Sequence, residues 1–528
     1  MRGLEFVVVI GGVILLTKVV AHKTRIAQPL LLVATGTVIG LIPVFGAIRL
    51  PPEVVLFLFL PALLYWESLT TSLREIRSNL RGIILMSTGL VVATAAGIAA
   101  CAHLLGLPWG PAWVLGAALA PTDATAAGSL TRSLPHRNVT ILKAESLIND
   151  GTALVLYALA VAFSVGHAAP TVATISLAFL IAYLGGAVAG GLVAWLAIIA
   201  RRRLHDPLTQ NVASLITPFA AYLIAETVHA SGVLAVVVAG LAMSQAGPRI
   251  GIAESRRQSD GFWGLSTFIL NGSLFVLVGI ELPAATRGLA STDLWRGLIT
   301  VAAISTVIIA IRFGYLFTTA YLIRLFDRRP QQRPRRLSNR SGVVSGFAGF
   351  RGAVSLAAVL AVPVRLNTGA PFPGREFIVF VTTGVIVVTL VVQGLILPGV
   401  VRWARLPHDS ALLKERRLAE TKAAKAALSE LPRLAAGLGI DKEVSDRVIN
   451  EYEERLAILE AAGNGDAEQA ILDHDAQATQ LRLGLLAARR QTVLRIRDEG
   501  RIDDVVLREI QRRLDVEEVR LSAGMTDR

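Results

Sequence analysis

The sequence predicts an all-α protein that crosses a membrane many times and ends in a soluble helical domain. Its 528 residues are 53% hydrophobic and 17% charged, with a mean hydropathy of +0.58, whereas about 25% of the residues of a soluble domain carry charge. Apolar runs of about 17–25 residues, the length of a helix that crosses a bilayer, recur as far as residue 402. Beyond that residue, apolar positions repeat at helical spacing among charged ones, which is typical of soluble amphipathic helices.

Thirteen apolar segments are long enough to be transmembrane helices. The first is followed by "HKTR" without a small-residue cleavage site, so we expect it to stay in the protein as a span. The expected spans cover about 4–21, 28–47, 51–66, 81–105, 110–130, 145–166, 171–200, 209–227, 231–246, 262–282, 295–324, 343–363 and 376–402.

The basic residues indicate how these spans are oriented. Residues 403–528 contain 21 Lys and Arg against 24 Asp and Glu, so the net charge of +13 comes from residues 1–402, and this distribution disfavours nucleic-acid binding. Alternate loops of the membrane domain hold 21 Lys and Arg, and the opposite loops hold five. Because cytoplasmic loops are enriched in Lys and Arg, we expect a plasma (inner) membrane protein with the N-terminus outside and the C-terminal tail in the cytosol.

Thirteen spans divide into two six-helix halves and one linker helix. An offset of seven spans between equivalent helices makes the halves inverted repeats. Span five contains "LAPTDATAAGS" and span twelve contains "GFAGFRGAVSLA". Both are rich in small residues and interrupted by a charge, as expected of crossed discontinuous helices. The linker candidate contains Gly185, Gly186, Gly190 and Gly191, which would let neighbouring helices approach closely.

The tail is expected to be a separate helical domain at 403–528. Pro432 and "AGNGD" at 462–466 are expected to separate its helices. A module for assembly or stability is the simpler interpretation, and a regulatory sensor is the alternative.

Five ionisable residues fall inside the expected spans, where a charge is costly and usually functional. The alternative is that they form buried salt bridges that only fix the packing of the helices. Two further acids, Glu67 and Glu226, lie near the ends of spans, so we expect both to be solvated. The five interior residues are Asp123, Glu145, Asp150, Arg312 and Arg351.

The segment "AESLINDGTALVLYALAVAF" at 144–163 carries the densest group of polar residues. On a helix, Ser146 and Asp150 share a face, and so do Glu145 and Asn149. If Glu145 takes one of the two arginines as a fixed partner, Asp150 has no permanent one. Desolvation then favours its neutral form, so that it can hold either a proton or a small cation. Oxygens of Asn149, Ser146, Thr122 and unwound backbone could complete the shell of a hard cation.

Asp123 and Arg351 suit the interrupted helices of spans five and twelve. Asp123 follows Pro121-Thr122, and the proline removes a backbone donor and interrupts the helix. An acid at this point can offset the positive end of a half-helix, and Arg351 can offset negative ends. Direct cation binding by Asp123 is the alternative role.

The motifs "APTDA", "ESLINDGTALVLY" and "GFRGAVSLA", in this order, resemble those of the sodium/proton exchanger branch of the monovalent cation/proton antiporters. "FLPALLYWES" is similar to the "LPPLLFE"-type segment of that family. The similarity covers about residues 4–402, and similar helical tails occur on bacterial members.

The resemblance implies a secondary transporter that exchanges Na+, or else Li+ or K+, for H+, electroneutrally and one for one, in the setting of pH homeostasis. It implies a homodimer with elevator-like alternating access in the lipid bilayer. The core spans would lie at about 81–166 and 295–402, the dimerisation spans at about 4–66 and 209–282, and the linker helix at about 171–200.

Carried over residue by residue, the resemblance also implies roles for the polar residues of the spans. Asp150 would alternately bind cation and proton, and Asn149 would complete the Asn-Asp pair. Thr122 and Ser146 would join Asp150 as ligands of Na+.

The remaining charges would be structural, with Glu145 paired to Arg312 and with Asp123 and Arg351 balancing the half-helices.

Other classes of protein fit these residues less well. A cation channel or uniporter would use the same site without obligatory coupling, and would carry current without a counter-moving proton. An intramembrane enzyme would need a nucleophile, a metal cluster or a histidine-centred set. However, Cys101 stands alone, and the eight histidines fall at segment ends, in loops or in the tail. We therefore expect a transporter that is not an enzyme and has no resident cofactor, with Na+ and H+ as its cargo.

Overall fold

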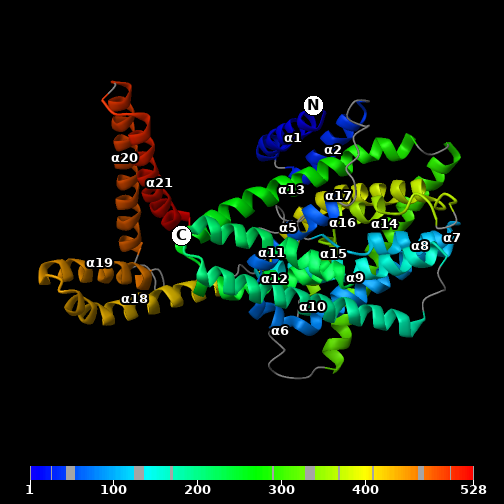
Figure 1. The fold of residues 1–528 in the computed structure, drawn as a ribbon, viewed down its shortest axis with the longest axis horizontal. Helices are drawn as coiled ribbons and strands as arrows, with labels where there is room; N and C mark the ends of the chain where they lie inside the picture. The colour runs from blue at the N-terminus through cyan, green and yellow to red at the C-terminus, as the bar shows by residue number, and fades with distance from the viewer. Residues whose placement is uncertain are drawn as a thin grey trace. The chain divides into compact units, whose positions relative to one another are not determined.

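The structure is a computed structural model that describes residues 2–24, 26–42, 54–123, 136–166, 171–287, 291–326, 339–366, 369–406, 410–461, 469–499 and 501–526. Within these residues the chain is almost entirely helical. It divides into two compact units, Met1–His408 and Asp409–Arg528. Figure 1 shows the first unit in blue to yellow and the second in orange to red.

Most helices of the first unit run roughly parallel or antiparallel to one another (Figure 1). Nine helices in the described residues are long and apolar enough to cross a membrane, and shorter apolar helices lie at Gln28–Gly40 and Leu56–Thr70. The chain is therefore a multi-pass membrane protein, and the count of thirteen spans stays a prediction. The elements are α1 (Arg2–Thr24), α2 (Gln28–Gly40), the π-helix η1 (Val55–Phe59), α5 (Leu60–Thr70), α6 (Leu73–Ile84), the π-helix η2 (Leu85–Leu90), α7 (Val91–Leu104), α8 (Trp109–Leu119), α9 (His136–Ser164), α10 (Val172–Arg203), α11 (Pro207–Thr227), α12 (Gly232–Ile250), α13 (Ala253–Arg287), α14 (Ser291–Phe326), α15 (Asn339–Phe347), α16 (Ala353–Leu360) and α17 (Arg375–Ala404).

Several of these helices begin earlier than the apolar pattern predicts, and two of them bear on the site. α6, η2 and α7 form one continuous helix from Leu73, where Ser72 accepts a hydrogen bond from the backbone N–H of Glu75 at 3.3 Å. α9 begins at His136, nine residues before the expected start at 145. Their first turns carry charges that hydropathy assigns to loops. The apolar side chains Ile76 and Ile83 of α6 nevertheless pack against Ala144 of α9. Glu145 is therefore the tenth residue of α9, in its third turn.

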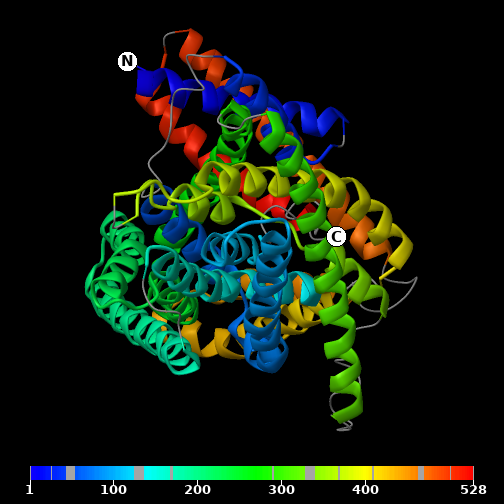
Figure 2. The same ribbon diagram turned by 90° about the vertical axis from the view of Figure 1, so that its right-hand side faces the viewer.

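The apolar side chains form several clusters, and two of the larger ones lie in different groups of helices. One cluster lies among α7, α8, α9, α14, α16 and α17, with Leu115 and Ile304 fully buried. Another lies among α5 and α10 to α13, around Tyr65 and Trp263. Figure 2 shows the cyan and blue helices of the first group beside the yellow α17. The division into core, dimerisation and linker regions stays a prediction.

Glycines allow the closest helix contacts of the first unit. At Gly36 and Gly40 of α2, a Cβ atom would overlap the backbone of α13, so only glycine permits this approach. In α10, Gly186 and Gly190 lie in the same way against the backbone around the start of α12. The expected packing role of the α10 glycines is thus seen, except that Gly191 faces open space.

The two expected discontinuous segments are both interrupted. α8 ends at Leu119, residues 121–123 are not helical, and the rest of "LAPTDATAAGS" lies outside the described residues. Span twelve consists of α15 and α16, separated by the non-helical residues 348–352. Inverted repeats stay a prediction. Residues 327–338, the arginine-rich segment between α14 and α15, are not among the described residues.

The second unit contains two helical hairpins (Figure 1). The helices are α18 (Ser410–Leu438), α19 (Lys442–Ala461), α20 (Gln469–Asp498) and α21 (Asp504–Thr526). The prediction that Pro432 separates helices is wrong, because α18 continues through it. The helix instead stops before Gly439, which has a φ of +65°. The N–H of Ile440 donates to the carbonyl of Ala435 at 2.9 Å, so the helix ends in a glycine C-cap. "AGNGD" lies outside the described residues.

Candidate ion-binding site

The non-helical segments after α8 and between α15 and α16 meet in the middle of the first unit. The backbone N–H of Asp123 donates to the carbonyl of Phe350 at 2.9 Å. Pro121 has no N–H and cannot continue the α8 ladder, so the carbonyls at the end of α8 need other donors. The contact therefore joins two broken elements that lie more than 200 residues apart in the chain.

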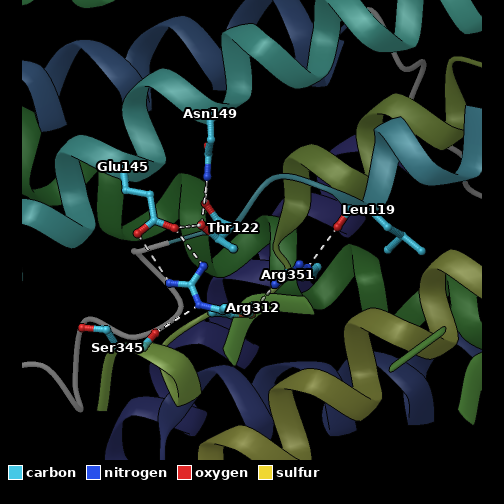
Figure 3. Close-up of polar contacts among 8 residues, drawn as sticks. Leu119, Thr122, Glu145, Asn149, Arg312, Ser345 and Arg351 are labelled. Carbon is cyan, nitrogen blue, oxygen red and sulfur yellow. Dashed lines mark hydrogen bonds and ion pairs between the residues drawn. The ribbon is translucent and has the colours of Figure 1, made fainter. Parts of the chain in front are cut away.

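Arg351 supplies the donor that the end of α8 lacks. Its Nε donates to the carbonyl of Leu119 at 3.0 Å, and its Nη1 donates to the carbonyl of Gly349 at 2.5 Å (Figure 3). A cation at the C-terminal end of a helix interacts favourably with the helix dipole. Arg351 thus lies at the C-terminal end of α8, and its structural role stays a prediction.

Asp123 lies at the N-terminal end of a helix, whereas Arg351 lies at a C-terminal end. A Cβ atom at Gly352, the N-cap residue of α16, would overlap the Asp123 carboxylate. The carboxylate therefore lies directly against the N-terminus of α16, where the helix dipole favours a negative charge. Glycine at position 352 is what makes this contact possible.

A buried ion pair joins α9 to α14. Nη1 of Arg312 donates to Oε1 of Glu145 at 2.8 Å, and Nη2 donates to Oε2 at 3.5 Å. Nε of Arg312 donates to the carbonyl of Ser345 on α15 at 3.1 Å (Figure 3). Only 2% of the Arg312 side chain is exposed, so the pair is removed from water. Each of the three guanidinium nitrogens thus has a hydrogen-bond acceptor, and the pair expected from the sequence is present.

Asn149 ties α9 to the break after α8. Its Nδ2 donates to the hydroxyl of Thr122 at 2.8 Å and to the Thr122 carbonyl at 3.2 Å. The Thr122 hydroxyl in turn donates to Oε1 of Glu145 at 3.4 Å (Figure 3). The Oδ1 atom of Asn149 is buried without a hydrogen-bond partner in the described residues. Thr122, Glu145 and Asn149 thus form one hydrogen-bonded cluster with Arg312.

A cavity lies beside this cluster and has acidic side chains in its wall. Its volume is about 40 Å³, above the roughly 10–15 Å³ that one water molecule requires. Its polar lining comes from Glu67, Asp123, Ser146, Asp150 and Asn271, and the remaining lining residues are apolar. A dehydrated cation fits such a space because carboxylate and hydroxyl oxygens are the ligands that hard cations prefer.

Asp150 differs from the other charged residues of the site. It is 5% exposed, and its carboxylate has no hydrogen bond or ion pair among the described residues. The ionisable groups that act on it, Asp123 and Glu67, are both acids, so neither offers a positive charge. A buried carboxylate in these surroundings must take up a positive charge, either a proton or a cation, to avoid the cost of unpaired burial.

Glu67 belongs to this cavity, contrary to the expectation from the sequence. It is 9% exposed, it lies on α5, and its Oε1 has no hydrogen-bond partner in the described residues. The apolar spacing offered a signal, because Leu60 and Leu63 precede it by seven and four residues and line the same cavity. Glu226, the other acid assigned to a span end, is exposed as expected.

The predicted site residues therefore separate into two neighbouring groups. Asp123, Ser146 and Asp150 line the cavity, whereas Thr122, Glu145 and Asn149 form the hydrogen-bonded cluster with Arg312. The functional roles assigned to these residues from the sequence stay predictions.

Interrupted helices that meet beside a buried acidic cavity are typical of secondary transporters that carry small ions. The chain belongs to the sodium/hydrogen exchanger family: residues 11–403 match the profile described as "Sodium/hydrogen exchanger, transmembrane". An uncharacterised Na+/H+ exchanger of Mycobacterium tuberculosis is 45% identical over 521 residues, which cover 98% of this chain and 96% of the relative. An uncharacterised Na+/H+ exchanger of Escherichia coli is 31% identical and covers 98% of this chain and 97% of its own.

A solved structure shows the same fold. The sodium proton antiporter MjNhaP1 from Methanocaldococcus jannaschii superposes with a TM-score of 0.58 at 16% identity, over 76% of this chain and 99% of its own. The resemblance that the motifs indicated is confirmed by these matches, and the relatives named here are transporters.

Proposed function

We propose that this protein exchanges a monovalent cation for H+ across the membrane, with Asp150 as the group that binds the two ions alternately. Its membership of the sodium/hydrogen exchanger family supports cation/proton exchange. The observation that carries the assignment to Asp150 is its buried carboxylate, which faces the cavity and has no partner among the described residues. The Glu145–Arg312 pair, in contrast, is already neutralised.

The cation would be held by oxygens that line or border the cavity. Asp150 supplies the negative charge, and Ser146, on the same face of α9, supplies a hydroxyl. The Thr122 carbonyl accepts one hydrogen bond from Asn149, and a carbonyl has a second lone pair that can bind Na+. Asn149 would hold the Thr122 carbonyl in place, while Asp123 and Arg351 keep the broken helices charge-balanced.

Charge balance favours electroneutral exchange of one cation for one proton. If Asp150 is the single group that binds and releases the ions, each loaded state of the site holds one positive charge, either the proton or the cation. The same group then faces each side of the membrane in turn, which fits an elevator-like movement within a homodimer. The asymmetry of Lys and Arg between the loops supports an N-terminus outside the plasma membrane and a cytosolic tail.

Na+ is the first candidate for the cation, and K+ or Li+ is the alternative. A protein of Bacillus pumilus named as a sodium, potassium, lithium and rubidium/H+ antiporter is 29% identical over 92% of this chain and 73% of its own. That relative supports measuring each cation separately. A channel or uniporter would show itself by current without proton counter-movement.

The test is Asp150→Asn in proteoliposomes that contain a pH-sensitive dye. We expect Na+-driven proton movement to be abolished, because the amide can neither release a proton nor neutralise Na+, while the protein remains folded by size-exclusion chromatography. Asp293→Asn is the matched control, since Asp293 is exposed at the start of α14 and its change should leave exchange intact. Normal exchange by the Asp150→Asn variant would refute the proposal.

A further inference from the structure

A second charged group of the first unit is buried without a counter-charge, away from the ion cavity. Arg201 lies in the last turn of α10 and is 7% exposed, and its Nε has no hydrogen-bond partner in the part of the chain that the structure describes. No hydrogen bond or ion pair to its guanidinium is present among the described residues. A buried, unpaired guanidinium is strongly unfavourable unless something else supplies the negative charge.

Among the described residues, the ionisable groups that act on Arg201 are Tyr65, whose hydroxyl is neutral near pH 7, and Arg256, so neither supplies a negative charge. Arg256 acts on it electrostatically as a like charge, and its own Nη1 donates to the Gly251 carbonyl. Nη2 of Arg201 lies 3.5 Å from where a Cβ of Gly251 would be. α13 begins two residues later, at Ala253, so the positive end of its dipole and its first free N–H groups lie at the same place.

The acidic residues nearest in sequence are engaged elsewhere. Asp206 accepts a hydrogen bond from the backbone N–H of Thr209 at 2.9 Å and caps α11. Glu254 accepts from Nε2 of Gln258 at 3.2 Å, one turn along α13. Neither acid is paired with Arg201.

A buried glutamine holds the two sides of this region together. Nε2 of Gln210 donates to the carbonyls of Arg201 and Leu204 at 3.2 and 2.8 Å, while its Oε1 accepts from the N–H of Ile252 at 3.3 Å. The end of α10 and the start of α13 are therefore fixed relative to each other. A fixed arrangement of donors binds a ligand without a large ordering cost.

We propose that Arg201, Arg256 and the N-terminus of α13 form a binding site for a phosphoryl anion. The planar guanidinium binds phosphate oxygens in pairs, and a helix N-terminus adds N–H donors and a favourable dipole. The anion supplies the counter-charge that Arg201 lacks in the protein itself. The site is separate from the ion cavity and does not depend on the proposed exchange.

The surrounding surface favours the headgroup of an anionic phospholipid as the source of this phosphate. α10 and α13 are both long enough to cross a membrane, and the site lies where α10 ends and α13 begins. Trp195 on α10 and Phe262 on α13 expose apolar side chains within two or three turns of the site, where acyl chains could lie. A soluble phosphate would use the same donors without this surface.

The experiment compares the thermal unfolding midpoint of the purified full-length protein in three settings. These are nanodiscs of phosphatidylcholine, the same nanodiscs with inorganic phosphate added, and nanodiscs of phosphatidylcholine with one quarter phosphatidylglycerol. We expect phosphatidylglycerol to raise the wild-type midpoint by several degrees, because a ligand that binds only the folded state stabilises it. A rise with inorganic phosphate as well would show that the phosphoryl group alone is sufficient. That result would also support the site, with free phosphate as a second possible ligand.

The variants are Arg201→Met and Arg202→Met, which remove the same charge from adjacent residues of α10, the first buried and the second exposed. Arg201→Met should lose the rise and unfold in phosphatidylcholine at a midpoint equal to or above that of the wild type, because it removes an unpaired buried charge. Arg202→Met should keep the rise. Native mass spectrometry should show phosphatidylglycerol binding about tenfold more weakly to Arg201→Met, as expected for the loss of a charge-assisted contact.

Three results would overturn the proposal: no rise of the wild-type midpoint with either anion, a full rise in Arg201→Met, or an equal loss in Arg202→Met. The last would indicate unspecific attraction of lipid to surface charge. If Arg201→Met does not fold, Arg256→Gln replaces it. Because the Arg256 side chain is exposed, we expect this variant to fold and to lose part of the rise, and a full rise in it would equally overturn the site.

Discussion

The Glu145–Arg312 pair allows a quantitative test of how this protein tolerates charge inside its membrane unit. Glu145→Gln keeps the shape of the side chain but removes its charge. Arg312 then loses the partner that its Nη1 and Nη2 bind at 2.8 and 3.5 Å, and keeps the Ser345 carbonyl. Removal of one member of a buried ion pair costs about 3–5 kcal/mol, because the other charge remains buried and unpaired. We expect a loss of this size in the free energy of unfolding.

A double variant separates the cost of the unpaired charge from the value of the pair. In Glu145→Met with Arg312→Met both charges are gone, and the main remaining losses are the partners of the Thr122 hydroxyl and the Ser345 carbonyl. An unsatisfied buried polar group costs about 1–3 kcal/mol, and the new methionines recover apolar contacts. The double variant should therefore be more stable than the single one.

The assay is equilibrium unfolding of the purified protein in mixed micelles, together with exchange measurements on the folded fraction. Glu376→Gln is the control, because it makes the same substitution at an exposed position in the first turn of α17. A structural role of the pair is contradicted if Glu145→Gln is no more destabilising than Glu376→Gln, or if the double variant is less stable than Glu145→Gln. A stable Glu145→Gln variant with a changed preference among cations would also contradict it, since Glu145 would then be a ligand.

Two further predictions concern the cavity and its surroundings. Gly352→Ala should lower the free energy of unfolding by about 1–3 kcal/mol and slow exchange, because the new Cβ would overlap the Asp123 carboxylate. Gly314→Ala is the control and should do neither, because a Cβ at that position has no other atom within 4 Å. Equal behaviour of the two variants in thermal unfolding and transport would contradict the contact at α16. If proton and cation compete for Asp150, acidification should raise the apparent KM for Na+ by up to about tenfold per pH unit and leave the maximal rate unchanged. A pH effect confined to the maximal rate would exclude a shared site.

The sequence is informative about the site wherever a single residue conflicts with its apolar surroundings. The acids of α9, Asp123 and the two arginines stand out for this reason, and the pairing of Glu145 with Arg312 follows from the family resemblance. Interruption of α8 follows from Pro121, and interruption of span twelve follows from glycines next to a charge. These features can be predicted without knowing which helices are neighbours, because a buried charge or a proline restricts the structure of its own segment.

The features that the sequence does not reveal depend on which helix lies opposite. Glu67 resembles a solvated residue at the end of a span, but α5 turns it into the cavity. Arg201 is one of three consecutive arginines, and packing against the start of α13 is what buries it and leaves its neighbour exposed. The polar first turns of α9 are covered by other helices: Asn138 and Thr140 are buried, and Nδ2 of Asn138 donates to the hydroxyl of Ser341 on α15. Hydropathy cannot detect such contacts.

The stoichiometry of exchange depends on Glu67, because it is the second acid of the cavity whose oxygen lacks a partner. If Na+ binds between Asp150 and Glu67 and displaces a proton from each, two protons move for one cation and the exchange carries charge. One-for-one exchange requires that Glu67 keep the same proton throughout the cycle. Glu67→Gln imitates the protonated acid, so the proposal predicts that this variant still exchanges Na+ for H+ and that an imposed membrane potential alters neither protein. If the wild type responds to the potential and the variant does not, both acids release protons and the one-for-one mechanism is wrong.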